Sequence, residues 1–287
     1  MIHEVLHPIP DRDVTLTTYI FDRSDVLWNL KYEWQPAKRP AVLICPGGAY
    51  SFVSDREGEP VALSFMQNGF NAFVLRYSVG DASAYPGPLE EISAAVWMIR
   101  SHAEEWYIDP DQIAICGFSA GGHLCTLLGT QWHTPGLCER LSIPEEGNKP
   151  NAMVLCYTTT GEETARNLEN GKQEAFEPAG PFGIGAMLNP QTLVPQAVTV
   201  NYIDEKTPPA YIWQAREDFL DVKESMHFAE KMYEIGVPFE LHIFGNGGHG
   251  MGLSSPLTNY YMDKFPANLK EWFPLCVGWL KALFHYR

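Results

Sequence analysis

A serine lies in a glycine-rich turn near the middle of the chain, where it could act as a nucleophile. The pentapeptide Gly117-Phe118-Ser119-Ala120-Gly121 fits the pattern G-x-S-x-G, follows an apolar run at 113–116 and precedes a helix-like run at 123–128. This strand–turn–helix setting is typical of a nucleophile elbow, in which a strained turn presents the serine and small neighbours avoid collisions. We therefore predict Ser119 as a catalytic nucleophile.

Such a serine needs a histidine base, which follows it in the chain order Ser, Asp or Glu, His. His249 lies among glycines at 245–250, directly after an alternating strand-like stretch. An imidazole in such a loop could swing over the sheet edge toward Ser119, so His249 is the predicted base. His123 also neighbours the nucleophile, but it lies on the predicted helix that directly follows Ser119, and the required order therefore favours His249.

The acid of the predicted triad should lie in the loop after the apolar run at 210–213. Asp218 is the best candidate there, and Glu217 and Asp221 compete with it within one turn. Asp218 could also serve as the N-cap of the helix that follows.

Cleavage of an ester also requires backbone N–H groups that bind the oxyanion. One should come from the residue after the nucleophile, Ala120. The others should come from Pro46-Gly47-Gly48-Ala49-Tyr50, which follows the first long apolar run and contains two glycines that allow close backbone approach. Gly48 and Ala49 are the predicted donors from this loop.

Three side chains near this loop each have two interpretations. Tyr50 either borders the substrate pocket or packs beneath the loop. Arg56 and Glu57 either support the loop through an ion pair or form a solvated surface pair.

The surrounding pattern alternates strands with helices, which predicts an α/β fold with a doubly wound, mostly parallel sheet. Continuous apolar runs, as expected for strands covered on both faces, occur at 41–45, 72–75, 113–116, 152–156 and 210–213. Amphipathic patterns predict helices over 89–106, 222–235 and about 269–284, and alternation predicts a late strand over 237–243. In the helix over 222–235, the expected apolar face consists of Val222, Met226, Ala229 and Tyr233.

No linker divides the chain, so one domain over 1–287 is expected. The stretch 157–209 has little periodicity and several prolines, and we interpret it as an insertion over the active-site edge of the sheet.

The composition suits a globular protein and limits its partners. The 287 residues are 45% hydrophobic, and the net charge of −15 disfavours nucleic acid and anionic membranes as partners. The start of the chain does not resemble a signal peptide, no apolar run is long enough to span a bilayer, and the six cysteines are scattered without zinc spacing. We expect a cytoplasmic protein without metal or cofactor.

With these residues identified, the chain resembles α/β-hydrolase esterases of the acetyl esterase and xylan esterase kind, relatives of the hormone-sensitive-lipase-like and feruloyl-esterase-like groups. The matching motifs are Pro46 to Tyr50, Arg56 to Pro60, Tyr85-Pro86 with Pro88-Leu89, Gly117 to Leu124, Thr207 to Ala210 and Gly247 to Gly250. The resemblance implies Ser119, Asp218 and His249 as the triad. It also implies the α/β-hydrolase fold and hydrolysis of short acyl esters, often acetyl groups on sugars. No motif of the group matches 161–200, where we expect specificity to reside.

The predicted function is that of a serine esterase acting on a small-molecule ester, with acetylated sugars or xylo-oligosaccharides as candidate substrates. Two alternatives remain at this point. One is a serine peptidase of the oligopeptidase-like kind, although such enzymes usually carry a large extra domain. The other is a catalytically inactive hydrolase fold that binds a ligand.

Overall fold

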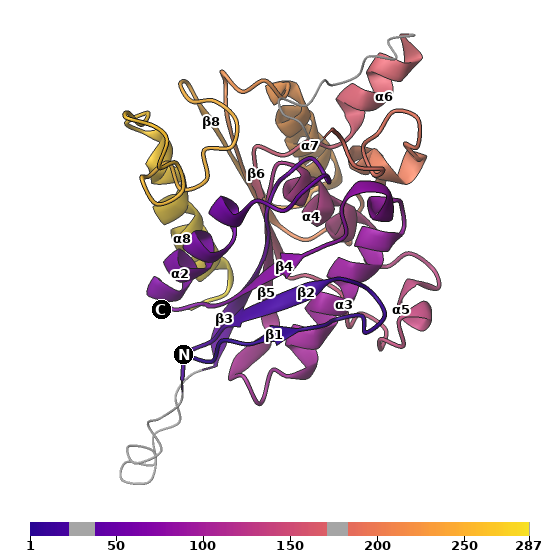
Figure 1. Cartoon of the computed structure of the whole chain (residues 1–287), viewed down its shortest axis with the longest axis vertical. Coiled ribbons are helices and arrows are strands. Elements are labelled where there is room, and N and C mark those ends of the chain that lie inside the picture. Colours follow the sequence, from indigo (N-terminus) through magenta and orange to yellow (C-terminus); the bar gives the residue numbers. More distant parts are fainter. Residues whose placement is uncertain (23–37, 171–182, 287) are drawn as a thin grey trace.

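A single sheet of eight strands forms the centre of the computed structural model, which describes residues 1–22, 38–170 and 183–286 (Figure 1). The strand order is β1-β2-β4-β3-β5-β6-β7-β8. The parallel part consists of β3 (Arg39–Cys45), β4 (Asn71–Arg76), β5 (Ile108–Phe118), β6 (Ala152–Cys156), β7 (Ala210–Ala215) and β8 (Phe239–Phe244). Each predicted strand is present. The five uninterrupted apolar runs form strands within the sheet, where both faces can be buried, and the alternating stretch forms β8 at its edge.

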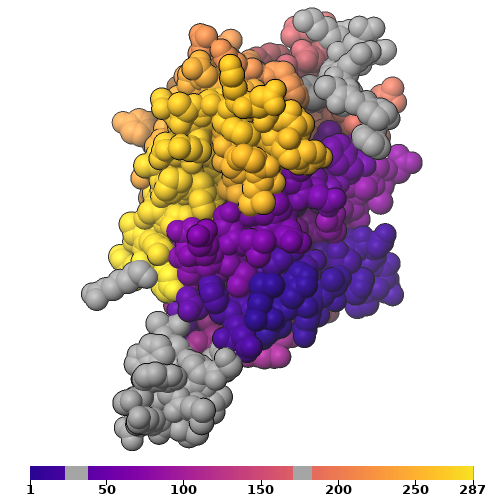
Figure 2. All heavy atoms as spheres, turned by 60° about the vertical axis from the view of Figure 1, so that its left-hand side comes forward, coloured from indigo at the N-terminus to yellow at the C-terminus, as the bar shows by residue number. Residues whose placement is uncertain are grey.

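Helices cover both faces of this sheet, as the doubly wound interpretation predicts. One face packs against α3 (Gly87–Ser101), α4 (Ala120–Gln131) and α7 (Val222–Ile235). The other packs against α2 (Glu59–Gln67) and α8 (Trp272–Leu283), the latter preceded by a 3-10 turn at Leu269–Glu271. Figure 2 shows the yellow C-terminal segment beside the violet segment that carries α2. Phe65 of α2 and Phe273 of α8 contact each other, with ring centroids 4.9 Å apart.

Two predictions about helices were wrong in detail. The helix expected over 89–106 ends at Ser101, although Trp106 remains buried. The apolar face expected for α7 is also wrong, because Met226 and Tyr233 are exposed, whereas Phe228 and Met232 are fully buried. The buried face of α7 includes polar residues, so a prediction based on apolar residues alone chose the neighbouring face of the helix.

The N-terminal part of the fold was not predicted. Strand β2 (Thr15–Tyr19) pairs antiparallel with β4, and the short β1 (Val5–Leu6) pairs antiparallel with β2. Helix α2 was not predicted either.

The stretch 157–209 contains the short helix α6 (Glu162–Glu169) and two 3-10 turns, Pro195–Ala197 and Thr199–Tyr202. Hydrogen bonds attach its later part to the loop after β3, since the Gly185 N–H donates to the Ala49 carbonyl at 2.9 Å. Within the described ranges of the chain, no helix has the length and apolar character needed to cross a membrane.

Three backbone segments meet at the carboxyl end of β5 with no room for a side chain between them. A Cβ added to Gly121 would lie 1.9 Å from the Cys45 carbonyl oxygen, and one added to Gly117 would lie 2.1 Å from the Gly121 carbonyl oxygen. The start of α4 therefore packs directly against the end of β3.

We predict that Gly121→Ala destabilises the protein by at least about 2 kcal/mol, because its methyl group would collide with the backbone of β3. Gly278→Ala in α8 is the matched control, since an added Cβ there meets nothing within 4 Å. That control should raise the free energy of unfolding by about 0.5–1 kcal/mol through helix propensity. Chemical denaturation of both variants measures the difference, and equal stabilities would contradict the steric argument.

Candidate active site

Ser119 occupies a strained turn between β5 and α4. Its backbone has φ 54° and ψ −120°, a conformation that non-glycine residues rarely adopt. The turn is held by a hydrogen bond of 3.0 Å from the Ser119 N–H to the Cys156 carbonyl on β6. Because α4 begins at Ala120, the positive end of its dipole lies beside the serine hydroxyl.

His249 lies between Ser119 and Asp218 in a continuous hydrogen-bonded chain. Its Nε2 is 2.8 Å from the Ser119 Oγ, and its Nδ1 is 2.9 and 3.1 Å from the two carboxylate oxygens of Asp218. Since an ionised carboxylate only accepts, Nδ1–H donates to Asp218 and leaves Nε2 free to accept the serine proton. The Asp218 side chain is fully buried, and the Leu220 N–H also donates to it at 2.9 Å.

The two competing acids have other contacts. Asp221 is the N-cap of α7 and accepts the Lys223 N–H at 3.0 Å, so the idea that Asp218 caps this helix was wrong. Glu217 accepts the Gly247 N–H at 3.3 Å in the loop that carries His249.

A pocket of about 40 Å³ opens beside the serine. Its lining residues are Ala49, Ser119, Ala120, Thr159, Thr164, Ile184, Leu188 and Leu220. The structure therefore brings Ala49 and Ala120, two of the three expected oxyanion donors, to the pocket beside Ser119. Gly48 and Tyr50 lie outside this set.

Gly48 determines the shape of the loop after β3. It has φ 135°, and a Cβ at this position would lie 2.0 Å from the Phe52 carbonyl oxygen, so only glycine fits. Ala49 and Tyr50 follow with φ values of 53° and 56°. This run of residues with positive φ leaves Ala49 at the pocket beside Ser119.

A buried carboxylate, that of Glu57, binds the loop after β3. Glu57 is only 3% exposed, and its two oxygens accept the Gly47 N–H at 2.8 Å and the Tyr157 hydroxyl at 2.6 Å. Burial raises the pKa of Tyr157 well above its usual value, so the phenol keeps the proton that it donates. The Tyr157 oxygen in turn accepts the Gly252 N–H at 2.9 Å, which links the loop after β3 to the segment that follows His249.

Arg56 and Glu57 therefore do not form the ion pair that was one interpretation of the sequence. Arg56 instead donates to the Thr258 carbonyl at 2.9 Å and the Gly250 carbonyl at 3.3 Å, next to His249. Neither residue fits the alternative of a solvated surface pair, because both bind backbone groups of other segments.

Tyr50 packs beneath its loop, the second of its two interpretations. Its fully buried hydroxyl is 2.9 Å from His123 Nδ1, and His123 Nε2 is 2.7 Å from the Ala197 carbonyl. Because the carbonyl can only accept, Nε2 carries the proton and Nδ1 accepts from the tyrosine. His123 thus joins the loop after β3 to the 3-10 turn at Pro195–Ala197 as a neutral imidazole.

Sequence reasoning missed Tyr157, Thr159 and Thr164. The first lies at the end of β6, and the two threonines line the pocket from a stretch without periodicity. The position of Tyr157 at the carboxyl end of a parallel strand, where sites of α/β proteins gather, was the one available signal. In the part of the chain that the structure describes, no group of His, Cys, Asp and Glu is arranged to hold a metal ion.

The sequence is similar to a family model and to known proteins. A family model described as BD-FAE matches residues 31–232. Endo-1,4-beta-xylanase B of Butyrivibrio fibrisolvens is 32% identical over 227 residues, which cover 76% of this chain and 33% of that protein. Acetylxylan esterase of Xylanibacter ruminicola is 27% identical over 238 residues, which cover 81% of this chain and 45% of that protein. The chain thus spans less than half the length of these two relatives.

Solved structures match the chain over almost its whole length. MGS-M1, an α/β hydrolase enzyme from a Medee basin deep-sea metagenome library, is 31% identical with a TM-score of 0.74 and covers 99% of this chain and 98% of its own. The acetyl ester-xyloside bifunctional hydrolase of Caldicellulosiruptor lactoaceticus is 29% identical with a TM-score of 0.71, over 98% and 92% of the two chains. The predicted α/β-hydrolase fold is confirmed.

The buried His123 predicts a particular dependence of stability on pH. Burial lowers the pKa of His123 to about 4, below that of an imidazole in an unfolded chain. The unfolded state therefore binds more protons between these two pKa values. The stability contributed by this residue is complete above about pH 6.5 and should fall by about 2–3 kcal/mol as the pH approaches 4.5.

His123→Gln keeps a donor and an acceptor but cannot titrate, so it isolates this effect. Urea denaturation at pH 7 and pH 4.5 should show the wild type losing its stability advantage over the variant at the lower pH. A difference between the two proteins that does not change with pH would refute the neutral, buried imidazole.

Proposed function

Since the chain belongs to the BD-FAE family, we propose that it is a serine carboxylic ester hydrolase that cleaves short acyl esters, with acetylated sugars as the candidate substrates. The observation that carries the proposal is the contact of 2.8 Å between the Ser119 Oγ and the His249 Nε2, with Asp218 behind the imidazole. An oriented base next to a hydroxyl is what nucleophilic catalysis by serine requires.

In the proposed reaction, His249 takes the hydroxyl proton while the Ser119 oxygen attacks the ester carbonyl carbon. The developing oxyanion is bound by the N–H groups of Ala49 and Ala120, two residues that line the pocket beside the serine. Gly48, the third predicted donor, contributes through the conformation that it gives the loop. The bond to the alcohol then breaks, and the alcohol leaves with the proton from His249. Water repeats the sequence on the acyl-enzyme and releases the acid.

The size of the pocket supports a short acyl group. A cavity of about 40 Å³ has room for a few heavy atoms, since each water molecule needs at least about 10–15 Å³ of such volume. Two alanines and two threonines form part of its wall, and Ile184, Leu188 and Leu220 complete the lining. An acetyl methyl group fits this space, which is the basis for proposing short acyl esters.

Sugars are proposed as the alcohol because of the relatives, one of which is named as an acetylxylan esterase and another as an acetyl ester-xyloside bifunctional hydrolase. A neutral, hydroxyl-rich substrate suffers no repulsion from a chain with a net charge of −15. The expected cytoplasmic location stays a prediction, as does the absence of a nucleic-acid or membrane partner.

We predict that Ser119→Ala lowers the hydrolysis of p-nitrophenyl acetate by about 10⁴-fold, because the variant has no nucleophile. Wild-type activity should decline as the acyl chain is lengthened from acetate to octanoate. Ser101→Ala is the control, since Ser101 is an exposed residue at the end of α3. Equal turnover by the wild type and Ser119→Ala would refute the serine mechanism, and the absence of turnover on every ester would favour a peptide substrate or ligand binding.

The identity of the acid gives a second prediction. Asp218→Asn should lower kcat on p-nitrophenyl acetate by about 10²–10⁴-fold, because an amide no longer fixes the His249 tautomer. Glu217→Gln, next to it in the same loop, should keep kcat within about threefold of the wild type, because Glu217 accepts the Gly247 N–H and is not the acid that faces His249. A larger loss in Glu217→Gln than in Asp218→Asn would assign the acid to Glu217.

A further inference from the structure

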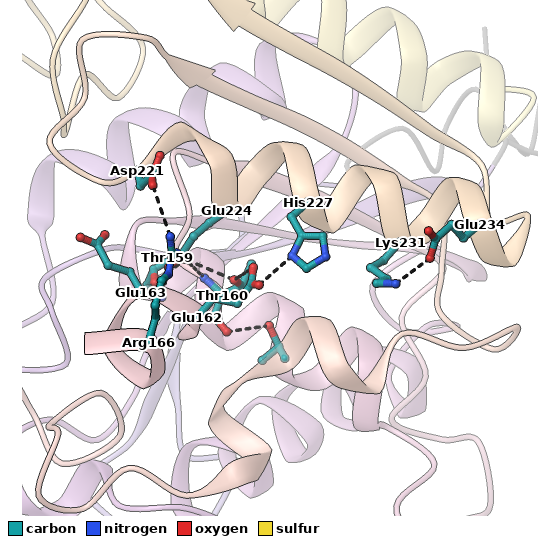
Figure 3. A network of polar contacts seen from close by, with 11 residues as sticks. Thr159, Thr160, Glu162, Glu163, Arg166, Asp221, Glu224, His227, Lys231 and Glu234 are labelled. Carbon is teal, nitrogen blue, oxygen red and sulfur yellow. Dashed lines mark hydrogen bonds and ion pairs between the residues drawn. The ribbon is translucent and has the colours of Figure 1, made fainter. Parts of the chain in front are cut away.

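A buried glutamate on α7 contacts the start of α6, next to the candidate acyl pocket. Glu224 is 3% exposed, and Figure 3 shows it pointing from α7 toward the segment that leads into α6. One carboxylate oxygen accepts the Thr160 N–H at 2.5 Å and the Thr159 hydroxyl at 2.8 Å, and the other accepts the Glu163 N–H at 2.6 Å. Both oxygens therefore receive backbone N–H donors from a segment about sixty positions away in the sequence.

These bonds supply a cap that α6 lacks. The residue at its N-cap position is Gly161, with φ 83°, and it makes no side-chain cap. The first N–H groups of a helix have no partner within it, and a carboxylate there also interacts favourably with the helix dipole. A helix of eight residues is marginal by itself, so its position depends on contacts of this kind.

The capped segment contributes directly to the pocket wall. Thr159 donates its hydroxyl proton to Glu224, and Thr164 is the buried residue of α6; both line the pocket beside Ser119. A shift of α6 away from α7 would therefore widen the space available to an acyl chain. The reacting atoms would not move with it, because Ser119 lies between β5 and α4 and His249 lies in the loop after β8.

We infer that Glu224 is a positioning residue that sets acyl-chain selectivity, by holding Thr159 and α6 in place as one wall of the pocket. The inference rests on the proposed esterase function and adds a specificity determinant to it. Glu224 touches neither the nucleophile nor its base in the contacts described above. It acts through the residues that line the pocket.

Other contacts between α6 and α7 are more exposed and should contribute less. His227 Nδ1 lies 2.7 Å from a Glu162 oxygen, and Arg166 lies 3.9 Å from Asp221, but the His227 and Arg166 side chains are about half exposed. Exposed ion pairs contribute little to stability. Desolvation raises the pKa of Glu224, and the bonds from Thr160, Glu163 and Thr159 oppose that rise, so these donors favour the charged form in its buried place.

Glu224→Gln is a sharp test because it preserves size and shape. A glutamine amide has one oxygen and one NH₂ group, whereas each of the two carboxylate oxygens of Glu224 accepts a backbone N–H. Either orientation of the amide therefore loses one of the two bonds. Glu234→Gln on the same helix is the matched control, since it removes an equal charge from an exposed ion pair with Lys231.

The measurement is the ratio of kcat/KM for p-nitrophenyl acetate to that for p-nitrophenyl butyrate. We expect this ratio to fall about tenfold in Glu224→Gln and to stay unchanged in Glu234→Gln, because the two extra methylenes of butyrate are discriminated by the fit of the wall. Hydrogen exchange at the amides of Thr160 and Glu163 should accelerate in Glu224→Gln only.

A second variant keeps the test decisive if Glu224→Gln does not fold. Thr164→Ala widens the same wall directly and should lower the selectivity ratio in the same direction. If the wild type hydrolyses the esters but Glu224→Gln has the same selectivity ratio, the inference is overturned and the esterase proposal is left intact. Where Glu224→Gln is insoluble, an unchanged ratio in Thr164→Ala has the same meaning. If the wild type shows no ester hydrolysis that is lost in Ser119→Ala, both the inference and the esterase proposal are overturned.

Discussion

The close approach of three backbone segments beneath Ser119 is the constraint on which the site depends. A side chain at Gly121 would occupy the space of the Cys45 carbonyl, and one at Gly47 would lie 3.0 Å from the Ser119 Cβ. The end of β3, the end of β5 and the start of α4 can therefore meet within van der Waals distance. This contact places the loop after β3 beside the serine, and the remaining parts of the site are added around it.

Much of this arrangement could be predicted from the sequence because its signals are local. An uninterrupted apolar run identifies a central strand, and a serine among glycines after such a run identifies the turn. What failed depended on partners distant in the chain. The antiparallel strand β2 is defined by its pairing with β4, and the buried face of α7 includes Glu224, which an apolar count treats as exposed.

The supporting residues of the site could not be predicted for the same reason. Glu57 and Glu224 are charged residues in polar surroundings of the sequence, where a solvated position is the ordinary expectation. Both are buried because donors from other segments converge on them, the Gly47 N–H and the Tyr157 hydroxyl on Glu57 and the Thr160 and Glu163 N–H groups on Glu224. Only the folded chain brings these donors together. Which of the three nearby acids faces His249 is likewise visible only in the folded chain, where an Asp218 oxygen lies 2.9 Å from His249 Nδ1.

These two carboxylates divide the site into parts that can change separately. Glu57 holds the loop after β3, which on the proposed function binds the oxyanion, and through Tyr157 it reaches the segment after His249. Glu224 holds Thr159 and also α6, and α6 lies within 161–200, where no motif of the esterase group matches. Because Glu224 caps α6 through backbone N–H groups, the side chains of α6 can be replaced while the cap is retained. Selectivity for the acyl chain could therefore change while the geometry around the nucleophile is preserved.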